Sequence, residues 1–371
     1  MNVWEIQKKH RNIIKNVMAI QKLWKGLKMG NSKVDLSIIV PCFNVEKYVA
    51  RCIDSLINQT LDNTRYEIIL VDDASTDCTW KIITEYEKKY PNMIIAVHCD
   101  ENGRQGKARN VGLEYASGEY IGYIDSDDWI DSDMYEIMLS EIMNYSGDIV
   151  HCNYIRDDGT RKIDCNSSGN IQRLLVDTQS KRGEFIVSGC IGYGCVTDVI
   201  KKSILVENNI QFPEKIAYED LFWRSIVYLY VKKISLIDKK FYHYYINPQS
   251  TVLKKNDDYH LDLMKINELK YNEYIRRGFL KLYRDELEFD MLDTWYLGMI
   301  KTLAFRFDKP PYSEFIKLKS IFNKLMPEAA LNKYIEGQFN EMQKLLISLL
   351  NVDVSETDFY NVINICRKTG V

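Results

Sequence analysis

The chain has 371 residues, close to half of them apolar, and a formal net charge of −3 at pH 7. This length exceeds one ordinary domain, so we expect a main domain of ~200–250 residues with appended segments. The near balance of charge gives no general reason to expect nucleic acid as a partner.

Cysteine usage and hydropathy indicate the compartment. The nine cysteines are scattered, with no Cys-x-x-Cys pair. This spacing argues against a disulfide framework or a structural zinc site and favours a reducing cytoplasm. No run reaches the ~18–20 apolar residues of a membrane span, and no signal-peptide core is present. We therefore expect a cytoplasmic protein that is soluble or bound to a surface.

Residues 1–33 are predicted to form a basic amphipathic helix and a linker. Residues 1–30 contain seven Lys or Arg and one Glu, a net charge of +6, which leaves −9 for the rest of the chain. Apolar residues recur at spacings of three, four or seven between the lysines, at Ile6, Ile13, Val17, Ile20, Trp24 and Leu27. Such a helix can lie on an anionic membrane, which would make the protein peripheral to the inner face of the cell membrane. It can equally pack on its own domain or on a partner subunit, and both alternatives stay open.

From residue 34 the pattern alternates between strands and helices. The strand-like runs lie at 36–40, 66–71, 93–97, 120–124 and 149–154, and helical spacing lies around 49–56, 80–86 and 108–116. Repeated βα units with short connections predict an α/β fold with a mixed, mostly parallel sheet flanked by helices. We expect this domain over 34–253, with a polar hairpin or loop at 155–183, and a mainly helical region over 254–371.

Two acidic clusters come directly after predicted strands. Asp72-Asp73 ends the second strand, and Asp125-Ser126-Asp127-Asp128 ends the fourth. Carboxylates are costly to bury, so we expect them at the strand ends, at the sheet edge where ligands of open α/β sheets bind. Asp125 and Asp127, two residues apart, can converge on one Mg²⁺ or Mn²⁺ that also binds phosphate oxygens. The alternative is an acidic helix start, the role we expect for Asp131 and Asp133.

Two weaker signals lie elsewhere in the chain. At Pro41-Cys42-Phe43-Asn44 a strand ends and a helix begins, so the aromatic ring can stack on a base and Asn44 can cap the helix. The same pattern is typical of any strand–turn–helix junction. Glu219-Asp220 stands among bulky apolar residues, where partial burial would raise a carboxyl pKa and suit one acid to general-base catalysis. Alternatively, both acids complement the dipole of a helix N-terminus.

The ordered set of motifs resembles the inverting glycosyltransferases of family 2, which have the Rossmann-like GT-A fold. The matching pieces run from about residue 35 to 250. They are Pro41-x-Phe43-Asn44, Glu67 through Asp73 with Ser75, Thr76 and Asp77, Ala108-Arg109-Asn110-x-Gly112, Gly118-Glu119-Tyr120-Ile121, Asp125 through Asp128, and Glu219-Asp220. Each piece is modest alone, but the set in this order is specific.

The resemblance implies transfer of a sugar from a nucleotide donor with inversion at the anomeric carbon. Asp220 would deprotonate the acceptor hydroxyl, and Glu219 would help to place the acceptor. Asp127, with Asp125, would hold Mn²⁺ or Mg²⁺ on the donor diphosphate. The residues expected at the nucleotide-sugar are Pro41, Phe43, Asn44, Asp73, Asn102, Arg109, Asp125, Ser126 and Asp127.

One stretch departs from the family pattern. Many relatives place an arginine five residues before the serine that corresponds to Ser250, and Tyr245 stands there in this chain. His243 is a candidate replacement, as a metal ligand or a hydrogen-bond donor to the diphosphate. A lone histidine is more often structural.

The sequence therefore favours a metal-dependent inverting glycosyltransferase that uses a UDP-sugar. Its expected acceptor is a glycan or lipid-linked glycan of the bacterial surface, such as capsule, exopolysaccharide or O-antigen, and the helical C-terminal region or the N-terminal helix would form any homodimer contact. The alternative is a non-catalytic nucleotide- or glycan-binding module on the same fold. Nucleotidyl transfer and a dinucleotide dehydrogenase are disfavoured, because the first strand is followed by neither a basic glycine-rich loop nor Gly-x-Gly-x-x-Gly.

Overall fold

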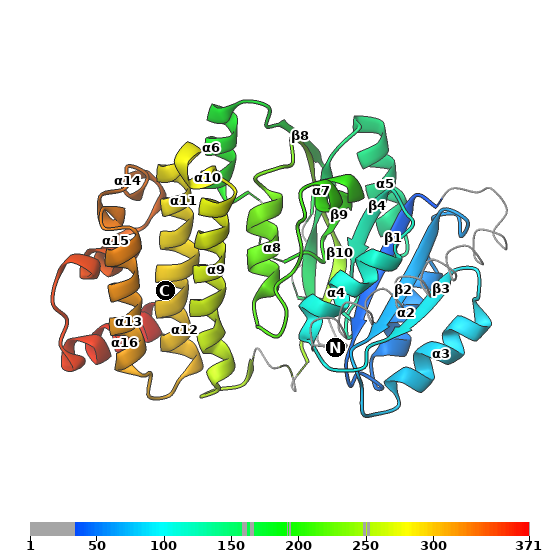
Figure 1. Ribbon diagram of the computed structural model, residues 1–371, viewed down its shortest axis with the longest axis horizontal. Coiled ribbons are helices and arrows are strands. Elements are labelled where there is room, and N and C mark those ends of the chain that lie inside the picture. Colours follow the sequence, from blue (N-terminus) through cyan, green and yellow to red (C-terminus); the bar gives the residue numbers. More distant parts are fainter. Residues whose placement is uncertain are drawn as a thin grey trace, which may run out of the picture.

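A computed structural model describes residues 34–157, 162–163, 167–190, 192, 194–247, 250 and 253–370. The helix expected over 1–33 lies outside these residues. The predicted α/β class is confirmed: a mixed, mostly parallel sheet flanked by helices is followed by a helical C-terminal region (Figure 1).

The strands follow the order β3-β2-β1-β4-β9-β6-β10-β5 across the sheet. Their bounds are Ile94–His98, Tyr66–Asp72, Leu36–Cys42, Tyr120–Tyr123, Asp198–Lys201, Ile149–Asp157, Lys233–Tyr245 and Trp129–Ile130. The first four are parallel, β9 is antiparallel to both β4 and β6, and β10 runs parallel to β6 and antiparallel to β5. Two short strands complete the sheet, β7 (Lys162–Ile163) on β6 and β8 (Ile171–Leu175) on β10. The antiparallel β6–β7 pair confirms the hairpin predicted within 155–183.

The register of the parallel strands aligns their carboxyl ends. Cys42 pairs with Asp72, and Asp72 pairs with His98, so β1, β2 and β3 end at the same edge. On the other side of β1, Ile39 pairs with Tyr123 of β4, and Asp125 follows two residues later. The two acidic clusters therefore leave the sheet at one edge.

Alternating residues of the central strands build two hydrophobic layers. Ile38 and Val40 of β1 belong to the layer that includes α2 (Val49–Ile57) and α5 (Met134–Tyr145). Ile39 faces the other layer, towards α4 (Arg104–Tyr115). A Cβ added at Gly112 of α4 would lie 2.3 Å from Ile39 Cγ2, so only glycine allows α4 to pack this closely on β1. The helix α3 (Thr79–Lys89) follows β2, so β1, β2 and β3 are each followed by a helix, namely α2, α3 and α4.

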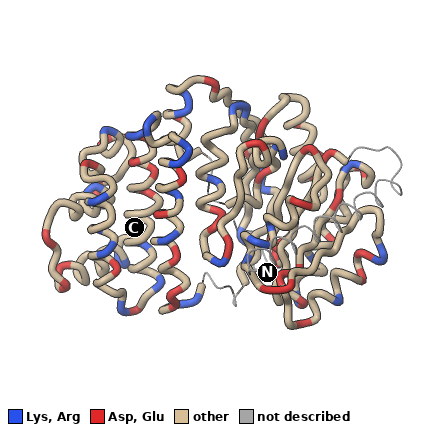
Figure 2. Tube along the Cα trace, in the orientation of Figure 1, with Lys and Arg blue, Asp and Glu red and all other residues tan. Residues whose placement is uncertain are grey.

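The C-terminal region is helical, as predicted. It contains α9 (Asp262–Arg276), α10 (Phe279–Leu282), α11 (Arg284–Met291), α12 (Gly298–Arg306), α13 (Tyr312–Leu325), α14 (Ile335–Gln338), α15 (Glu341–Ser348) and α16 (Glu356–Thr369), with a π-helical segment at Leu292–Leu297. Lys and Arg are interspersed with Asp and Glu over this region (Figure 2).

Three further helices join the sheet to this region: α6 (Gln179–Ser188), α7 (Lys202–Glu207) and α8 (Glu219–Val227). In Figure 1, α8 lies between the sheet and α9. One buried apolar cluster includes Ile39 of the sheet, Trp223 of α8 and Trp295 of the C-terminal region. The core is therefore continuous across residue 254, and the division into 34–253 and 254–371 stays a prediction. Among the described helices, none has both the length and the apolar character needed to span a membrane.

Candidate active site

The loop after β1 is tied to the loop after β2. Asn44 has a left-handed backbone (φ 51°); its N–H donates to Ser75 Oγ (3.0 Å), and its Oδ1 accepts from the Thr76 N–H (2.8 Å). The prediction that Asn44 caps the following helix is wrong, because α2 begins at Val49, Tyr48 occupies its N-cap, and the Asn44 amide is used on the neighbouring loop. The two loops form one wall of the sheet edge.

Phe43 and Pro41 differ in how they can meet a ligand. Phe43 is 45% exposed, so its ring is available on this wall. Pro41 is buried within β1, opposite Val71 of β2. Contact of either residue with a base stays a prediction.

Asp73 and Asn102 lie together beside that wall. Asp73 is buried, and both of its carboxylate oxygens accept from the Gly103 N–H at 3.0 Å. Asn102 Nδ2 donates to the Asp73 carbonyl oxygen at 3.2 Å. Burial raises the pKa of Asp73, although the Gly103 N–H and the nearby Lys107 oppose the rise. The start of α4 is thereby held against the end of β2.

The acidic turn after β4 contains one structural and two accessible carboxylates. Asp128 is buried; it accepts from the Tyr242 hydroxyl and, at 2.7 Å, from the Tyr245 N–H, and burial raises its pKa well above the usual range. Asp127 is half-buried, and burial together with the charge of Asp125 raises its pKa. The Asp125 side chain is 25% exposed. Ser126 between them is buried. Asp125 and Asp127 are therefore the acids that this turn presents to a ligand.

Arg51 of α2 supports this turn, and the sequence reasoning missed it. Its Nη2 donates to the Asp127 carbonyl oxygen at 2.6 Å. Its guanidinium lies 3.8 Å from the centroid of the Trp129 ring and 4.6 Å from that of Tyr245. A separation of 76 residues left no local pattern that could have linked Arg51 to the turn. An arginine therefore lies beside Asp127 even though Tyr245 occupies the position where relatives have one.

Arg109 joins the two halves of the candidate site. It is 2% exposed, and its Nη1 donates to Glu219 Oε1 at 2.5 Å while its Nη2 donates to Asp125 Oδ1 at 2.8 Å. Burial would lower the pKa of Arg109, but the charges of Asp125 and Glu219 hold it well above its ordinary value. The guanidinium also lies 5.2 Å from the centre of the Phe212 ring. Residues 94 positions apart in the chain therefore meet on one buried cation.

Glu219 and Asp220 begin α8, after Tyr218 in a left-handed conformation (φ 61°). The expected placement at a helix N-terminus is confirmed. Burial raises the pKa of Glu219 to about 7, with Arg109 opposing the rise and Asp220 adding to it. Asp220 is half-buried, and burial raises its pKa too, with Arg109 again opposing and Asp125 adding. Since Glu219 is bonded to Arg109 and Asp220 accepts from the Leu221 N–H (2.9 Å), Asp220 is the better placed of the two to take a proton.

His243 is engaged on both sides of its ring. It is buried, with Nε2 2.8 Å from Asp131 Oδ1 and Nδ1 3.1 Å from Asp157 Oδ2, and it stacks on Trp129. Coordination of a metal by His243 would require it to leave one of these carboxylates. Ser250 donates its N–H to the Asn247 carbonyl oxygen.

The acids expected at the next helix start have other partners. Asp131 bonds to His243, and Asp133 Oδ2 accepts from Lys239 Nζ at 2.7 Å. Asp133 does occupy the N-cap of α5, but its side chain makes no capping bond. The acidic helix start is therefore confirmed for Asp133 by its position at the N-cap, whereas the Asp131 carboxylate bonds to His243.

The residues suited to a divalent cation are Asp125 and Asp127. Within the described ranges, no group of three or more His, Cys, Asp and Glu side chains is arranged to hold a metal ion. Mg²⁺, however, needs only one or two protein carboxylates when a diphosphate supplies further oxygens. Asn247 Nδ2 donates to Asp127 Oδ2 at 3.3 Å, and Arg109 uses only Oδ1 of Asp125. Burial, and after it the charge of Asp125, raise the pKa of Asp127; a bound cation would favour the charged carboxylate against both effects, so the pair fits such an ion.

Comparison with known proteins identifies related chains. The family model described as glycosyl transferase family 2 matches residues 37–198. EpsH of Bacillus subtilis strain 168, which is named as a glycosyltransferase, is 32% identical over 261 residues, which cover 68% of this chain and 73% of EpsH. The poly(ribitol-phosphate) beta-glucosyltransferase of Bacillus spizizenii is 32% identical over 212 residues, which cover 57% of this chain. The matched part of this chain covers 32% of that relative, so this chain spans about a third of the relative's length.

A solved structure has a similar fold. Staphylococcus aureus TarS 1-349 in complex with UDP-GlcNAc aligns with a TM-score of 0.66 over 91% of this chain and 92% of that chain. The sequence identity in this alignment is 19%, so the likeness shows the fold alone.

Proposed function

The chain belongs to glycosyltransferase family 2, and on that premise we propose that it transfers a sugar from a nucleotide-sugar to a hydroxyl of a bacterial surface glycan. The observation that supports this most directly is the Arg109 bridge. It brings the donor-side acid Asp125 and the acceptor-side acid Glu219 onto one guanidinium, at 2.8 and 2.5 Å. A shared site of this kind is what transfer between two substrates requires.

The donor nucleotide would lie along the wall formed by the loops after β1 and β2. Phe43 offers an exposed ring for the base, and Asp73 and Asn102 lie on the adjoining side. A UDP-sugar is the donor class that we propose, since the TarS structure similar in fold was solved with UDP-GlcNAc.

Asp127 and Asp125 would hold a Mn²⁺ or Mg²⁺ ion on the donor diphosphate. When bound, such an ion supplies positive charge to the departing nucleoside diphosphate. Arg51 stabilises the turn that presents these carboxylates, through its bond to the Asp127 carbonyl oxygen.

Asp220 would act as the general base. It takes the proton of the acceptor hydroxyl while the acceptor oxygen bonds to the anomeric carbon and the bond from that carbon to the diphosphate oxygen breaks. Attack on the face opposite the leaving group inverts the anomeric configuration. Glu219, held in a buried ion pair with Arg109 next to Asp220, would help to place the acceptor.

We further propose an acceptor that is a hydroxyl-rich surface polymer, because curated relatives are named for poly(ribitol-phosphate) and teichoic acid.

The enzyme would work at the cytoplasmic side of the membrane, with residues 1–33 contacting anionic lipid. Deletion of residues 1–29 should then reduce co-sedimentation with anionic vesicles, and equal sedimentation of the full chain and the deletion variant would contradict the membrane contact.

The function is tested by incubating the full chain with a panel of nucleotide-sugars, with Mn²⁺, Mg²⁺ or EDTA. We expect one UDP-sugar to be hydrolysed slowly in the presence of metal and to raise the melting temperature by at least ~2 °C. Binding without any hydrolysis or transfer would instead favour the non-catalytic binding module. Absence of both binding and turnover across the panel would overturn the proposal.

A further inference from the structure

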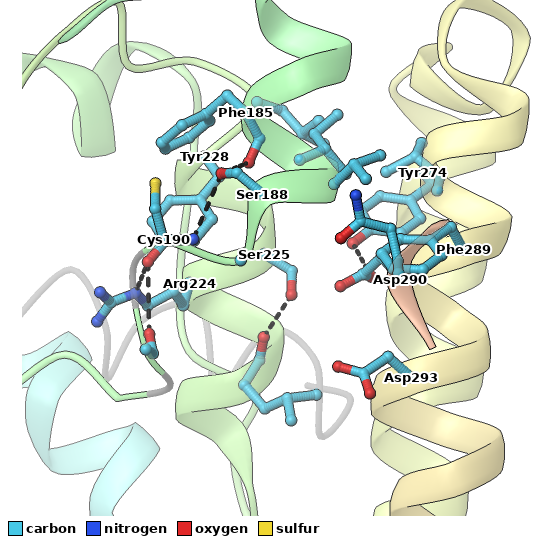
Figure 3. A pocket seen from close by; sticks show the side chains of 18 of the residues that line it. Phe185, Ser188, Cys190, Arg224, Ser225, Tyr228, Tyr274, Phe289, Asp290 and Asp293 are labelled. Carbon is cyan, nitrogen blue, oxygen red and sulfur yellow. Dashed lines mark hydrogen bonds between the residues drawn. The ribbon is translucent and has the colours of Figure 1, made fainter. Parts of the chain in front are cut away.

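A cavity of about 270 Å³ lies between α8 and the C-terminal helices. We name it the α8 cavity. Its walls come from α6, α8, α9, α11, the π-helical segment, the end of α14 and the start of α15, with the segment after α6 at its rim. Figure 3 shows Asp290 and Asp293 projecting from the C-terminal helices towards Ser225 of α8. The volume approaches the ~300 Å³ lower bound of ordinary ligand pockets, so the cavity suits a single small unit.

The lining combines aromatic rings with hydrogen-bonding groups. The aromatic residues are Phe185, Tyr228, Tyr274, Phe289 and Phe339. The polar residues include Ser188, Ser225, Asp290, Asp293, Gln338 and Gln343. Ring faces that cover C–H surfaces, together with carboxylate, amide and hydroxyl groups that bond to O–H groups, are the requirements of a polyhydroxylated ligand.

Several of these polar groups are already oriented. Asp290 Oδ2 accepts from Lys270 Nζ (2.9 Å) and from the Tyr274 hydroxyl (3.2 Å), and neither bond uses Oδ1. Ser225 Oγ donates to the Leu221 carbonyl oxygen at 2.8 Å, and therefore turns its lone pairs away from that bond. The cavity thus presents fixed acceptors, which match the O–H donors of a sugar or polyol.

The charges of the lining disfavour a phosphate. Two carboxylates, Asp290 and Asp293, line the cavity together with one cation, Arg224. Arg224 Nη1 is 3.0 Å from Asp198 Oδ2, and the same guanidinium donates to the Gly194 carbonyl oxygen, so its charge is already compensated. Lys270 is bonded to Asp290. A neutral unit therefore fits this cavity better than an anionic one.

The cavity lies on the helix that carries the proposed base. Leu221, Ser225 and Tyr228 recur at helical spacing and all line it, and Asp220 precedes the first of them. With a rise of about 1.5 Å per residue, Ser225 lies ~7.5 Å beyond Asp220 along the helix axis. Tyr228 and Leu229 follow the last residue of α8, Val227. A Cβ added at Gly194, whose carbonyl Arg224 holds, would lie 3.7 Å from Asp220 Oδ2. The cavity thus starts at the residue after Asp220, and a unit held at Ser225 would lie ~7.5 Å along the helix axis from the base.

We propose that the α8 cavity binds a neutral, hydroxyl-rich unit of the acceptor, set back from the hydroxyl that reacts at Asp220. This inference rests on the proposed transferase function. It assigns to the C-terminal helices a share in acceptor recognition, because Asp290 and Asp293 lie there.

Cys190 at the rim of the cavity gives a test that leaves the aromatic and acidic residues of its lining unsubstituted. Its thiol is exposed, so a bulky maleimide can be attached to the folded full chain. Cys78 and Cys165 are first replaced by serine, which leaves Cys190 as the intended target. Binding of ribitol and of ribitol 5-phosphate is measured by saturation-transfer NMR, and hydrolysis of the donor without acceptor is measured in parallel. The matched control carries Cys190→Ser in the same background and receives the same reagent.

We expect the unlabelled chain to bind ribitol more tightly than ribitol 5-phosphate, and the adduct to weaken ribitol binding by at least ~10-fold. Donor hydrolysis should change by less than about twofold, because the adduct lies away from the donor wall. Ribitol binding that is equal with and without the adduct, or tighter binding of the phosphate, would overturn the proposal. If the unlabelled chain neither binds nor hydrolyses any nucleotide-sugar, the transferase function fails instead, whatever the ribitol result.

Discussion

The acidic turn at Asp125–Asp128 and the acids Glu219 and Asp220 are held in different ways. The turn at Asp125–Asp128 follows a central strand and is fixed by groups from several elements, including Arg51 of α2 and Tyr242 of β10. Glu219 and Asp220 stand at the start of one helix, and the ion pair with Arg109 is their link to the sheet side. The donor-side turn is therefore positioned by side chains from several elements, whereas the Glu219 carboxylate is held by one buried cation, Arg109. Substitutions of Arg109 and of the acids on each side should show how stability and activity depend on these contacts.

The largest effect is expected when that cation is removed. Arg109→Leu leaves Asp125 and Glu219 without their shared partner in a buried site, and should lower the free energy of unfolding by about 3–5 kcal/mol. Urea unfolding measures the change. Arg65→Leu is the control, because Arg65 pairs with Asp35 while 41% exposed and should cost at most about 1 kcal/mol. Equal losses in the two variants would show that the Arg109 bridge does not hold the site together.

The next largest effect tests the base. Asp220→Asn keeps the size of the side chain but removes its ability to take a proton, so turnover should fall at least ~10²-fold. Donor affinity should stay within about twofold, because Asp220 lies on the acceptor side. Transfer assays with varied donor concentration measure both quantities, with Asp353→Asn on the exposed C-terminal surface as the control. Turnover that survives this substitution would assign the proton transfer to another group.

A smaller effect is expected on the donor side. Asp127→Asn removes one carboxylate from the proposed metal pair and should weaken metal-dependent donor binding by about 10-fold, with loss of the stimulation by Mn²⁺. Donor hydrolysis across a Mn²⁺ titration measures this loss, and Asp100→Asn, at an exposed position, serves as control. An unchanged titration would remove the metal assignment from Asp127.

The smallest effect concerns the dependence of stability on pH. Burial raises the pKa of Glu219 to about 7, whereas the ordinary value is 4.5. Between pH 4.5 and 7 the folded state therefore binds more protons at this group than the unfolded state, so its contribution to stability falls as the pH rises. Glu219→Gln removes this contribution, and unfolding at pH 5 and pH 7 should show a shallower decline than in the unsubstituted protein. A steeper or identical slope would mean that Glu219 is charged across this range.

Much of the fold was predictable from local patterns. Alternating apolar runs and turns identified β1, β2, β3, β4 and β6, because burial on a sheet imposes a short period that the sequence displays directly. The helical spacing after residue 253 predicted the C-terminal helices for the same reason. The acids at the strand ends were also visible, since a buried strand must place carboxylates at its ends.

Other elements and roles depended on contacts between distant segments. The short strands β5, β7 and β9 have no pattern of their own and exist because they pair with β10, β6 and β4. Asn44 was predicted as a cap, but the loop after β2 lies close enough to take its amide. His243 was predicted as a candidate metal ligand, and only the fold places Asp131 and Asp157 at its two ring nitrogens.

The sequence by itself determined the order of the strands along the chain, the family, and the kinds of side chain available for chemistry. Only the tertiary structure decided that Arg109 joins Asp125 to Glu219, that Arg51 supports the acidic turn, and that a cavity lies along α8 from Leu221 onwards. The physical reason is that periodicity reports which face of an element is buried, whereas the partner of a buried charge is fixed by how distant elements pack.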